Sequence, residues 1–456
     1  MKIAKVIPIF KTGSSQDMTN YRPISTLTSF SKILEKIVHK RLYDFLDANQ
    51  ILYDNQFGFR RNHSTALAVI ETIDRISESM DSRKQTLGVF LDLSKAFDSI
   101  RHDILLDKLS HYGIRGLPLE WFRSFLTNRF QFVSYAGSIS DLLPILCGVP
   151  QGSILGPLLF LIYINDVSHS SKTLNFILFA DDTSAFLSSS RVLHLFQDMT
   201  LELNHLSNWF CANFLLLNIK KSNYVLFSGP RTTNTDLNIQ PLLINSVELK
   251  RVSNVKFLGV ILDEHLTWHD HILMIKNKVS KVVGIINSLR WKLPTGILRN
   301  LYNSFMLPYL TYCTTVWGGV SPNRLKPIFL LQKRLVRIIA GVHYLAHSSP
   351  LFKSLNLLSI NDIYRHQLAT LMYRHQSGLL PSIFKNFFST NSDLHHYNTR
   401  KKQDYRSAIS RIGARSSSVR IMGPKLWNSI DPSIRSALSL SSFKYAFKSL
   451  LMSQYS

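Results

Sequence analysis

Residues 90–98 read Phe-Leu-Asp-Leu-Ser-Lys-Ala-Phe-Asp, and residues 179–182 read Phe-Ala-Asp-Asp. Each stretch places acidic residues directly after a short run of β-forming residues: Asp92 in the first, and Asp181 and Asp182 in the second. Local pairing is impossible, because Asp92 and Asp181 lie 89 positions apart. Adjacent antiparallel strands would bring the three carboxylates together, and this pairing decides the fold that we expect.

Three carboxylates at one strand end repel one another strongly unless cations neutralise them. A site made only of oxygen ligands suits Mg²⁺, with Mn²⁺ as a substitute, because these ions bind carboxylates and substrate phosphates. Two such ions would activate the 3′-hydroxyl of a primer and stabilise the departing pyrophosphate. We therefore predict nucleotidyl transfer, with Asp92, Asp181 and Asp182 as both metal ligands and catalytic residues. An isolated Asp-Asp pair is more often a β-turn, so this hypothesis depends on the surrounding sequence.

The spacing of apolar residues predicts a mixture of helices and strands up to residue 264, and helices beyond it. Helices are expected over residues 29–46, 65–80, 104–112, 118–126, 155–166 and 192–213, and strands over 4–10, 86–93, 131–136 and 224–228. Residues 176–187 are expected to form a strand, a tight turn with Asp181 and Asp182, and a second strand. Further helices are expected over 269–289, 294–312 and 327–340, followed by a basic helical region, 341–456. The expected fold class is therefore α+β.

Length and charge point to a large nucleic-acid-binding protein. The 456 residues exceed what one hydrophobic core usually holds, so two or three structural units are expected. The formal net charge is +24, and residues 265–456 contain 26 Lys and Arg but only 5 Asp and Glu. Such a surface attracts polyanions, which favours nucleic-acid binding over a simple gain in solubility.

Cysteine usage and hydropathy bear on the compartment. Cys147, Cys211 and Cys313 are scattered, which argues against a zinc knuckle and a disulfide framework. The longest apolar run, at residues 155–164, is far shorter than the roughly 20 residues of a membrane span, and the N-terminus lacks the apolar core of a signal peptide. We expect an intracellular protein of the nucleus and cytoplasm, without a membrane partner.

The two acidic stretches flank a third characteristic stretch, Gly148-Val149-Pro150-Gln151-Gly152-Ser153. In this order and spacing, the three stretches resemble catalytic motifs of reverse transcriptases. Other similar segments are Asn-Tyr-Arg-Pro-Ile-Ser at 20–25 and Gln-Phe-Gly-Phe-Arg at 56–60 in the fingers, and 217–222 and 257–259 in the palm. Residues 396–400 and 423–428 resemble the tail of jockey-like elements. The resemblance is thus to reverse transcriptases of non-LTR retrotransposons.

This resemblance implies a right-hand polymerase fold, with fingers and palm over 1–264, a helical thumb over 265–340, and a C-terminal region, 341–456, without an assigned role. It implies RNA-directed DNA synthesis, in which deoxynucleotides extend a primer 3′-end with Mg²⁺. The partners would be an RNA template and a DNA primer or target. Relatives usually carry an endonuclease domain before the polymerase, whereas this chain starts inside the fingers. Target nicking is therefore expected from a missing segment or another protein.

The resemblance also assigns substrate contacts. Phe97 matches the bulky ring beneath the incoming sugar, which would clash with a 2′-hydroxyl and so favours deoxynucleotides. Leu93, Gln151 and Gly152 match positions that contact the nucleotide or template, and the glycine would let the backbone approach closely. Arg60 matches the fingers arginine that binds the triphosphate, where a guanidinium makes bidentate phosphate contacts.

Two sets of basic residues have weaker assignments. Lys221 matches a lysine proposed to protonate pyrophosphate, but Lys220 lies next to it and is an equal alternative. In the helix expected over 327–340, Lys333, Arg334 and Arg337 share a face opposite its apolar residues. That face would suit a thumb that contacts duplex phosphates, or it is an ordinary solvated helix face.

Other readings stay open. A group II intron maturase or a telomerase would share the palm, although the fingers and tail segments favour the retrotransposon group. An RNA-dependent RNA polymerase would share the acids but not Phe97. A truncated or repurposed copy could bind nucleic acid without catalysis, and the sequence does not separate it from an active enzyme.

Overall fold

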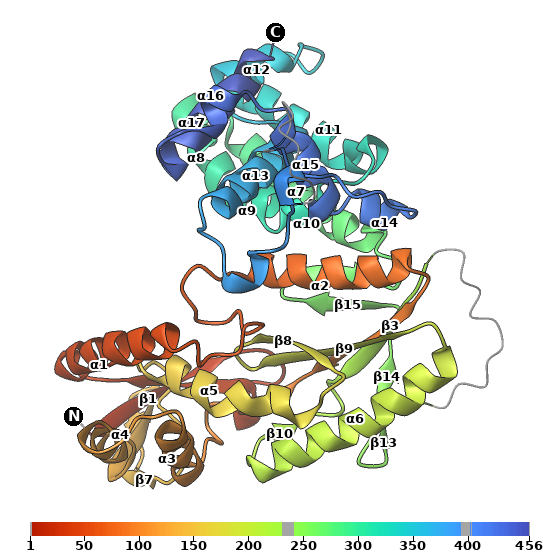
Figure 1. Cartoon of the computed structure of the whole chain (residues 1–456). Coiled ribbons are helices and arrows are strands. Elements are labelled where there is room, and N and C mark those ends of the chain that lie inside the picture. The colour runs from red at the N-terminus through yellow and green to blue at the C-terminus, as the bar shows by residue number, and fades with distance from the viewer. Residues whose placement is uncertain (1, 230–240, 394–401, 403, 456) are drawn as a thin grey trace.

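The protein has a mixed α+β fold in the computed structural model, which describes residues 2–229, 241–393, 402 and 404–455 (Figure 1). A central sheet has the strand order β14-β11-β3-β9-β8. Its strands are β3 (Gln85–Leu91), β8 (Asn175–Phe179), β9 (Asp182–Ser189), β11 (Asn223–Phe227) and β14 (Lys250–Arg251). All neighbours are antiparallel except β11 and β14. The predicted fold class is confirmed. The predicted pairing of the two strands that precede the acids is wrong, because β9, which begins at Asp182, lies between β3 and β8 and pairs with both.

Both faces of the central sheet are covered by helices. Leu87, Val89 and Leu91 of β3 belong to a core on one side, which includes α5 (Gly156–Ile164) and α6 (Val192–Ala212). Phe186 and Phe227 face the other side, where α2 (Thr65–Asp81) packs. This double coverage explains why β3 is buried at nearly every position instead of alternating between buried and exposed residues. It also explains α5, which is apolar all round and buried along almost its whole length.

A second sheet and three further helices lie within residues 3–145. The sheet contains β1 (Ile3–Phe10), β2 (Tyr21–Thr26), β5 (Arg129–Tyr135), β6 (Ser138–Ile139) and β7 (Leu143–Ile145). The helices are α1 (Ser29–Ala48), α3 (His102–His111) and α4 (Leu117–Leu126). Helices α1, α3 and α4 and strands β1 and β5 agree with the expected elements to within two residues at their ends, whereas β2, β6 and β7 lie outside the expected strands.

Helix α1 is confirmed, but the face that it buries is only partly the apolar one. Leu42 and Leu46 are buried, whereas Phe30 and Ile33 in the first half are exposed. The first half instead buries Glu35, which binds a neighbouring loop described below. Apolar spacing therefore predicted the helix correctly, yet a single polar contact decided the orientation of its first turns.

Helices make up most of the described chain after residue 264. They include α7 (His269–Leu289), α8 (Thr295–Leu301), α9 (Leu307–Thr311), α10 (Thr314–Trp317), α11 (Pro322–Ala340), α13 (Ile360–Gln376), α14 (Gly413–Ser416), α15 (Val419–Asn428) and α17 (Leu440–Ser453). The helix expected over 327–340 begins five residues earlier, because Pro322 occupies the first turn, where a missing N–H costs nothing. Pro327 then lies inside the helix. The helix expected over 294–312 is present as α8, a π-helical turn (Tyr302–Met306) and α9.

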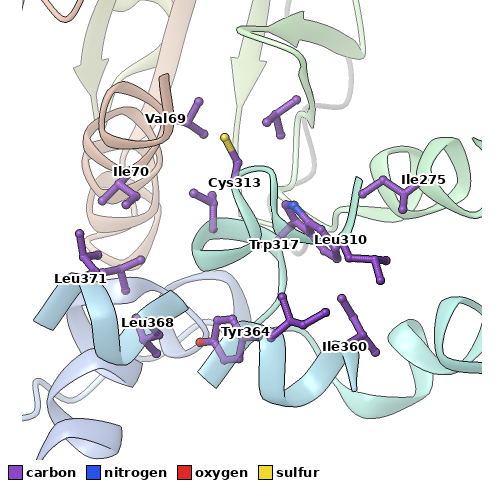
Figure 2. Packing of buried hydrophobic residues seen from close by; sticks show 14 of the residues in the cluster. Val69, Ile70, Ile275, Leu310, Cys313, Trp317, Ile360, Tyr364, Leu368 and Leu371 are labelled. Carbon is purple, nitrogen blue, oxygen red and sulfur yellow. The ribbon is translucent and has the colours of Figure 1, made fainter. Parts of the chain in front are cut away.

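The predicted thumb and the C-terminal region share one hydrophobic core with α2. Figure 2 shows Val69 of α2 near Cys313, and Trp317 near Tyr364 and Ile360 of α13. In Figure 1, α2 accordingly lies between the central sheet and the helices that follow residue 265. The packing is continuous across residue 340, so the domain boundaries at 264 and 340 stay predictions.

Charged contacts join the C-terminal region to α2. Arg415 Nη1 lies 2.5 Å from Asp74 Oδ1, and both side chains are buried. Arg420 Nε lies 3.2 Å from Asp74 Oδ2 on its other side. Part of the positive charge of the second half is thus used inside the protein.

Of the two tail segments, only residues 423–428 lie within the described part of the chain. Residues 396–400 lie outside the described residues. Residues 423–428 belong to α15, where Gly423 faces Met372 so closely that a Cβ would lie 2.7 Å from its sulfur. That stretch is therefore a packing surface between α13 and α15. Among the described residues, no helix combines the length and the apolar character that crossing a membrane would require.

Candidate active site

The register of the central sheet brings the three predicted acids to one edge. Leu91, the last residue of β3, pairs with Thr183 of β9, so the next step places Asp92 opposite Asp182. Strands β8 and β9 join through a tight turn in which Phe179 pairs with Asp182. Ala180, in this turn, has a φ of +56°. Asp181 therefore lies at the tip of the turn, beside the other two acids.

The carboxylates interact electrostatically. Burial, together with the charges of Asp181 and Asp92, raises the pKa of Asp182 to about 6. The pKa of Asp181 is also raised, first by burial and then by Asp92, against the opposing effect of its own backbone hydrogen bond and of Arg22 and Lys11. Both side chains still reach solvent. The edge is thus a place where negative charge is costly and a cation would be stabilised.

The donor set fits a divalent cation in its chemistry. All three side chains offer carboxylate oxygens, which hard cations such as Mg²⁺ prefer. Within the part of the chain that the structure describes, however, no three His, Cys, Asp or Glu side chains form a ready-made metal cluster. The assignment of Asp92, Asp181 and Asp182 as metal ligands stays a prediction.

The segment 217–222 fixes the backbone of Asp92. The Asp92 N–H donates to Ser222 Oγ (3.1 Å), and the Asp92 carbonyl accepts from the Asn218 N–H (2.8 Å). Lys221 is in the same turn, with its N–H 3.1 Å from Asn218 O, and its side chain is exposed. Lys220 is exposed as well. The structure therefore places a lysine near the candidate site but does not favour Lys221 over Lys220.

The loop 148–153 is held by the stretch that carries Asp92. Gln151 Nε2 donates to both oxygens of Asp98, each at 2.9 Å. A Cβ on Gly148 would lie 2.8 Å from Asp98 O, and a Cβ on Gly152 would lie 2.6 Å from Ser25 O. These glycines, with φ of +83° and +123°, thus allow protein segments to approach one another. Their predicted contacts with nucleotide or template are not tested by this geometry.

More than half of the chain matches one family of polymerases. A family model described as "Reverse transcriptase (RNA-dependent DNA polymerase)" matches residues 9–262. The chain belongs to the reverse transcriptase family. The matched range includes Asp92, the loop 148–153 and the turn at 179–182, so the three stretches that the sequence singled out lie in the family's own region.

Several relatives of this reverse transcriptase come from Drosophila melanogaster. It is 30% identical over 373 residues to the "RNA-directed DNA polymerase from mobile element jockey", covering 79% of this chain and 40% of the relative. It is 29% identical over 398 residues to the "Probable RNA-directed DNA polymerase from transposon X-element", covering 84% and 43%. The predicted kinship with jockey-like non-LTR enzymes is confirmed. The chain spans less than half the length of these curated relatives.

Solved structures with some overlap include apo telomerase from Candida tropicalis. That protein is 13% identical, and the match covers 78% of this chain and 66% of the other, with a TM-score of 0.42. At this level of overlap, the similarity adds nothing to the family assignment.

Two predicted substrate residues in the reverse transcriptase motif around Asp92, Phe97 and Leu93, have different surroundings. The ring of Phe97 stacks on Phe160 with centroids 4.6 Å apart and is half-buried, so one part of it stays accessible. Leu93 is only 8% exposed and pairs with Leu217 through the backbone. The side chain of Leu93 belongs to the core, and any contact with a nucleotide would have to come from its backbone.

The predicted fingers arginine is turned into its own loop. Arg60 Nη1 donates to Tyr53 O (2.8 Å) and less closely to Gln56 O (3.4 Å). The neighbouring Arg61 pairs with Asp44 at 2.8 Å. The structure therefore shows Arg60 stabilising a loop, and its predicted triphosphate contact would require its side chain to turn.

The three predicted thumb cations do not present one free face. Lys333 Nζ lies 4.5 Å from the centre of the Phe329 ring, and Arg337 Nε donates to Ala346 O (2.7 Å). Both side chains are half-buried, whereas Arg334 is exposed. Helical spacing placed these residues correctly on α11 but gave no sign of the two contacts.

Sequence reasoning missed a buried acid that supports the loop 148–153. Glu35 of α1 accepts hydrogen bonds from the N–H groups of Ile154 (2.7 Å) and Leu155 (3.3 Å). It thereby satisfies free N–H groups at the start of α5. A single Glu in an amphipathic helix carries no signal of such a contact.

Proposed function

We propose that this chain is the polymerase portion of a non-LTR retrotransposon protein, and that it extends the 3′-hydroxyl of a primer with deoxynucleotides on an RNA template. Membership of the reverse transcriptase family supports the reaction class. The register of β3 with β9, which pairs Leu91 with Thr183 and so directs Asp92 toward Asp182, is the observation that supports this edge as the site of chemistry.

Asp92, Asp181 and Asp182 would hold two divalent cations. Bound there, Mg²⁺ would lower the pKa of the primer hydroxyl and stabilise the charge that develops on pyrophosphate. The chain itself contributes the positions of these three acids. Asp92 directly follows β3, Asp181 lies in the turn between β8 and β9, and Asp182 begins β9. The segment 217–222 fixes the backbone at Asp92.

Phe97 would select the sugar. Stacking on Phe160 fixes the orientation of its ring, and a rigid ring beside the bound nucleotide would leave little space for a 2′-hydroxyl. The RNA template and the DNA primer are the proposed partners, and the low acid content of residues 265–456 supports their binding.

Primer extension tests this proposal. The wild type, Asp181→Asn and Asp198→Asn are compared on a DNA primer annealed to RNA, with deoxynucleotides and Mg²⁺. Asp198 is an exposed acid on α6 and serves as the matched control. We expect extension by the wild type and by Asp198→Asn, and none by Asp181→Asn. A folded wild type that binds primer-template without extending it would instead support the truncated, non-catalytic reading.

A further inference from the structure

A loop from the predicted fingers lies directly against the catalytic turn. Within residues 53–60, hereafter the 53–60 loop, the Phe57 N–H donates to Leu178 O (2.8 Å). In return, the Leu178 N–H donates to Asn55 O (2.9 Å). The loop thus continues the central sheet beyond β8 and reaches Ala180, the residue before Asp181.

The side chain of Gln56 fixes the backbone of Ala180. Gln56 Oε1 accepts from the Ala180 N–H (3.1 Å) and from the Gly58 N–H (2.8 Å). Two N–H donors meet at this atom, so it must be the carbonyl oxygen of the amide. Gln56 is only 1% exposed, and water cannot easily take over as the acceptor.

Ala180 needs such support. Its φ of +56° lies in the left-handed region, which residues other than glycine adopt at an energetic cost. Its buried N–H would be left without a partner if Gln56 were removed. A Cβ on Gly58 would lie 2.4 Å from the Ala180 nitrogen, so the close approach of loop and turn also requires glycine at position 58.

The 53–60 loop is itself held from two sides. Arg60 binds the carbonyl groups of Tyr53 and Gln56 within the loop. The ring of Phe57 packs edge-on against Phe384 of the C-terminal region, with centroids 6.4 Å apart. The C-terminal region therefore covers the loop from behind, and the acceptor on Gln56 cannot readily move away from the turn.

We propose that Gln56 is a positioning residue for the catalytic turn. It holds Ala180 in the left-handed conformation and thereby sets the position of Asp181. The inference rests on the proposed function, in which Asp181 is one of the acids that bind the divalent cation. Gln56 acts through Ala180 and takes no part in the chemistry itself.

Hydrogen exchange tests the contact without nucleic acid or metal. Gln56→Met removes the acceptor while keeping a similar volume. Gln332→Met is the matched control, because Gln332 is equally buried and accepts from the Ile360 N–H (2.8 Å) away from the site. We expect the amide of Ala180 to exchange at least about tenfold faster in Gln56→Met and at the wild-type rate in Gln332→Met.

Kinetics test the consequence. A displaced Asp181 should lower kcat by about 10- to 100-fold in Gln56→Met, with little change in the KM for deoxynucleotide, and should raise the Mg²⁺ concentration needed for half-maximal rate. Adding Ala180→Gly should restore part of kcat, because glycine adopts the same φ without a penalty.

The outcomes separate the two proposals. Wild-type exchange and kcat in Gln56→Met would overturn the role of Gln56, as would equal losses in Gln332→Met. An inactive wild type in which the exchange of Ala180 still responds to Gln56→Met would uphold the positioning of the turn and overturn the polymerase assignment.

Discussion

The ion pair between Arg415 and Asp74 should dominate the attachment of the C-terminal region to α2. Both side chains are 7% exposed, and the same Arg415 nitrogen also donates to Asp74 O (3.0 Å) and to Ser77 Oγ (3.3 Å). Arg415→Met would leave a buried carboxylate with Arg420 as its remaining cation. Removing one partner of a buried pair costs about 3–5 kcal/mol, and Arg420 should keep the loss near the lower end.

Urea unfolding followed by circular dichroism measures this loss. Arg101→Met is the matched control, because Arg101 pairs with Asp103 at 2.8 Å on the surface, where such a pair contributes about 1 kcal/mol or less. The double variant Asp74→Leu with Arg415→Met should recover most of the stability, since it leaves no unpaired buried charge.

The free energy of unfolding that Arg415→Met loses should depend on pH in a defined direction. Burial raises the pKa of Asp74 despite the nearby Arg415 and Arg420. Ionised Asp74 therefore costs stability, and this cost grows as the pH rises through its folded pKa. The penalty of Arg415→Met should be smaller in acid, where Asp74 is protonated, than at neutral pH. A penalty below about 1 kcal/mol at neutral pH would refute the reasoning.

Three further predictions concern the site. The pKa of Asp182 is raised from 3.8 to about 6, so its ionisation destabilises the metal-free fold as the pH rises through about 6. Mg²⁺ should therefore raise Tm more at pH 8 than at pH 5. An equal rise at both pH values would contradict this. Phe97→Ala should raise kcat/KM for ribonucleotides relative to deoxynucleotides, measured by single-nucleotide extension, and an unchanged ratio would exclude Phe97 as the sugar filter. Arg334→Ala should weaken primer-template binding and lower the salt slope by about 1, whereas Lys333→Ala should change that slope less, because Lys333 already contacts Phe329.

The sequence predicted that the acids follow strands because that signal is local: a β-forming run with Asp after it places the carboxylate near a strand end, as at β3 and β8. It did not predict that β9 lies between these two strands and pairs with both. The kinship with jockey-like enzymes came from contiguous residues.

What the sequence could not predict depends on partners distant in the chain. Gln151 turns toward Asp98, 53 positions away, and Glu35 binds Ile154, 119 positions away. Arg60 turns back to Tyr53 although its motif assigns it to a phosphate. In each case the residue type is compatible with several contacts, and only the packing of other elements decides among them.

The central claim is that Asp92 and Asp182 act as one unit in nucleotide addition. Single-turnover incorporation of one deoxynucleotide on an RNA template tests it with Asp92→Asn, Asp182→Asn and the double variant, each checked for wild-type folding. We predict that each single variant loses at least about a thousandfold in rate and that the double variant loses hardly more, because residues of one catalytic unit are strongly non-additive. Losses that multiply in the double variant, or an active Asp92→Asn, would contradict the account.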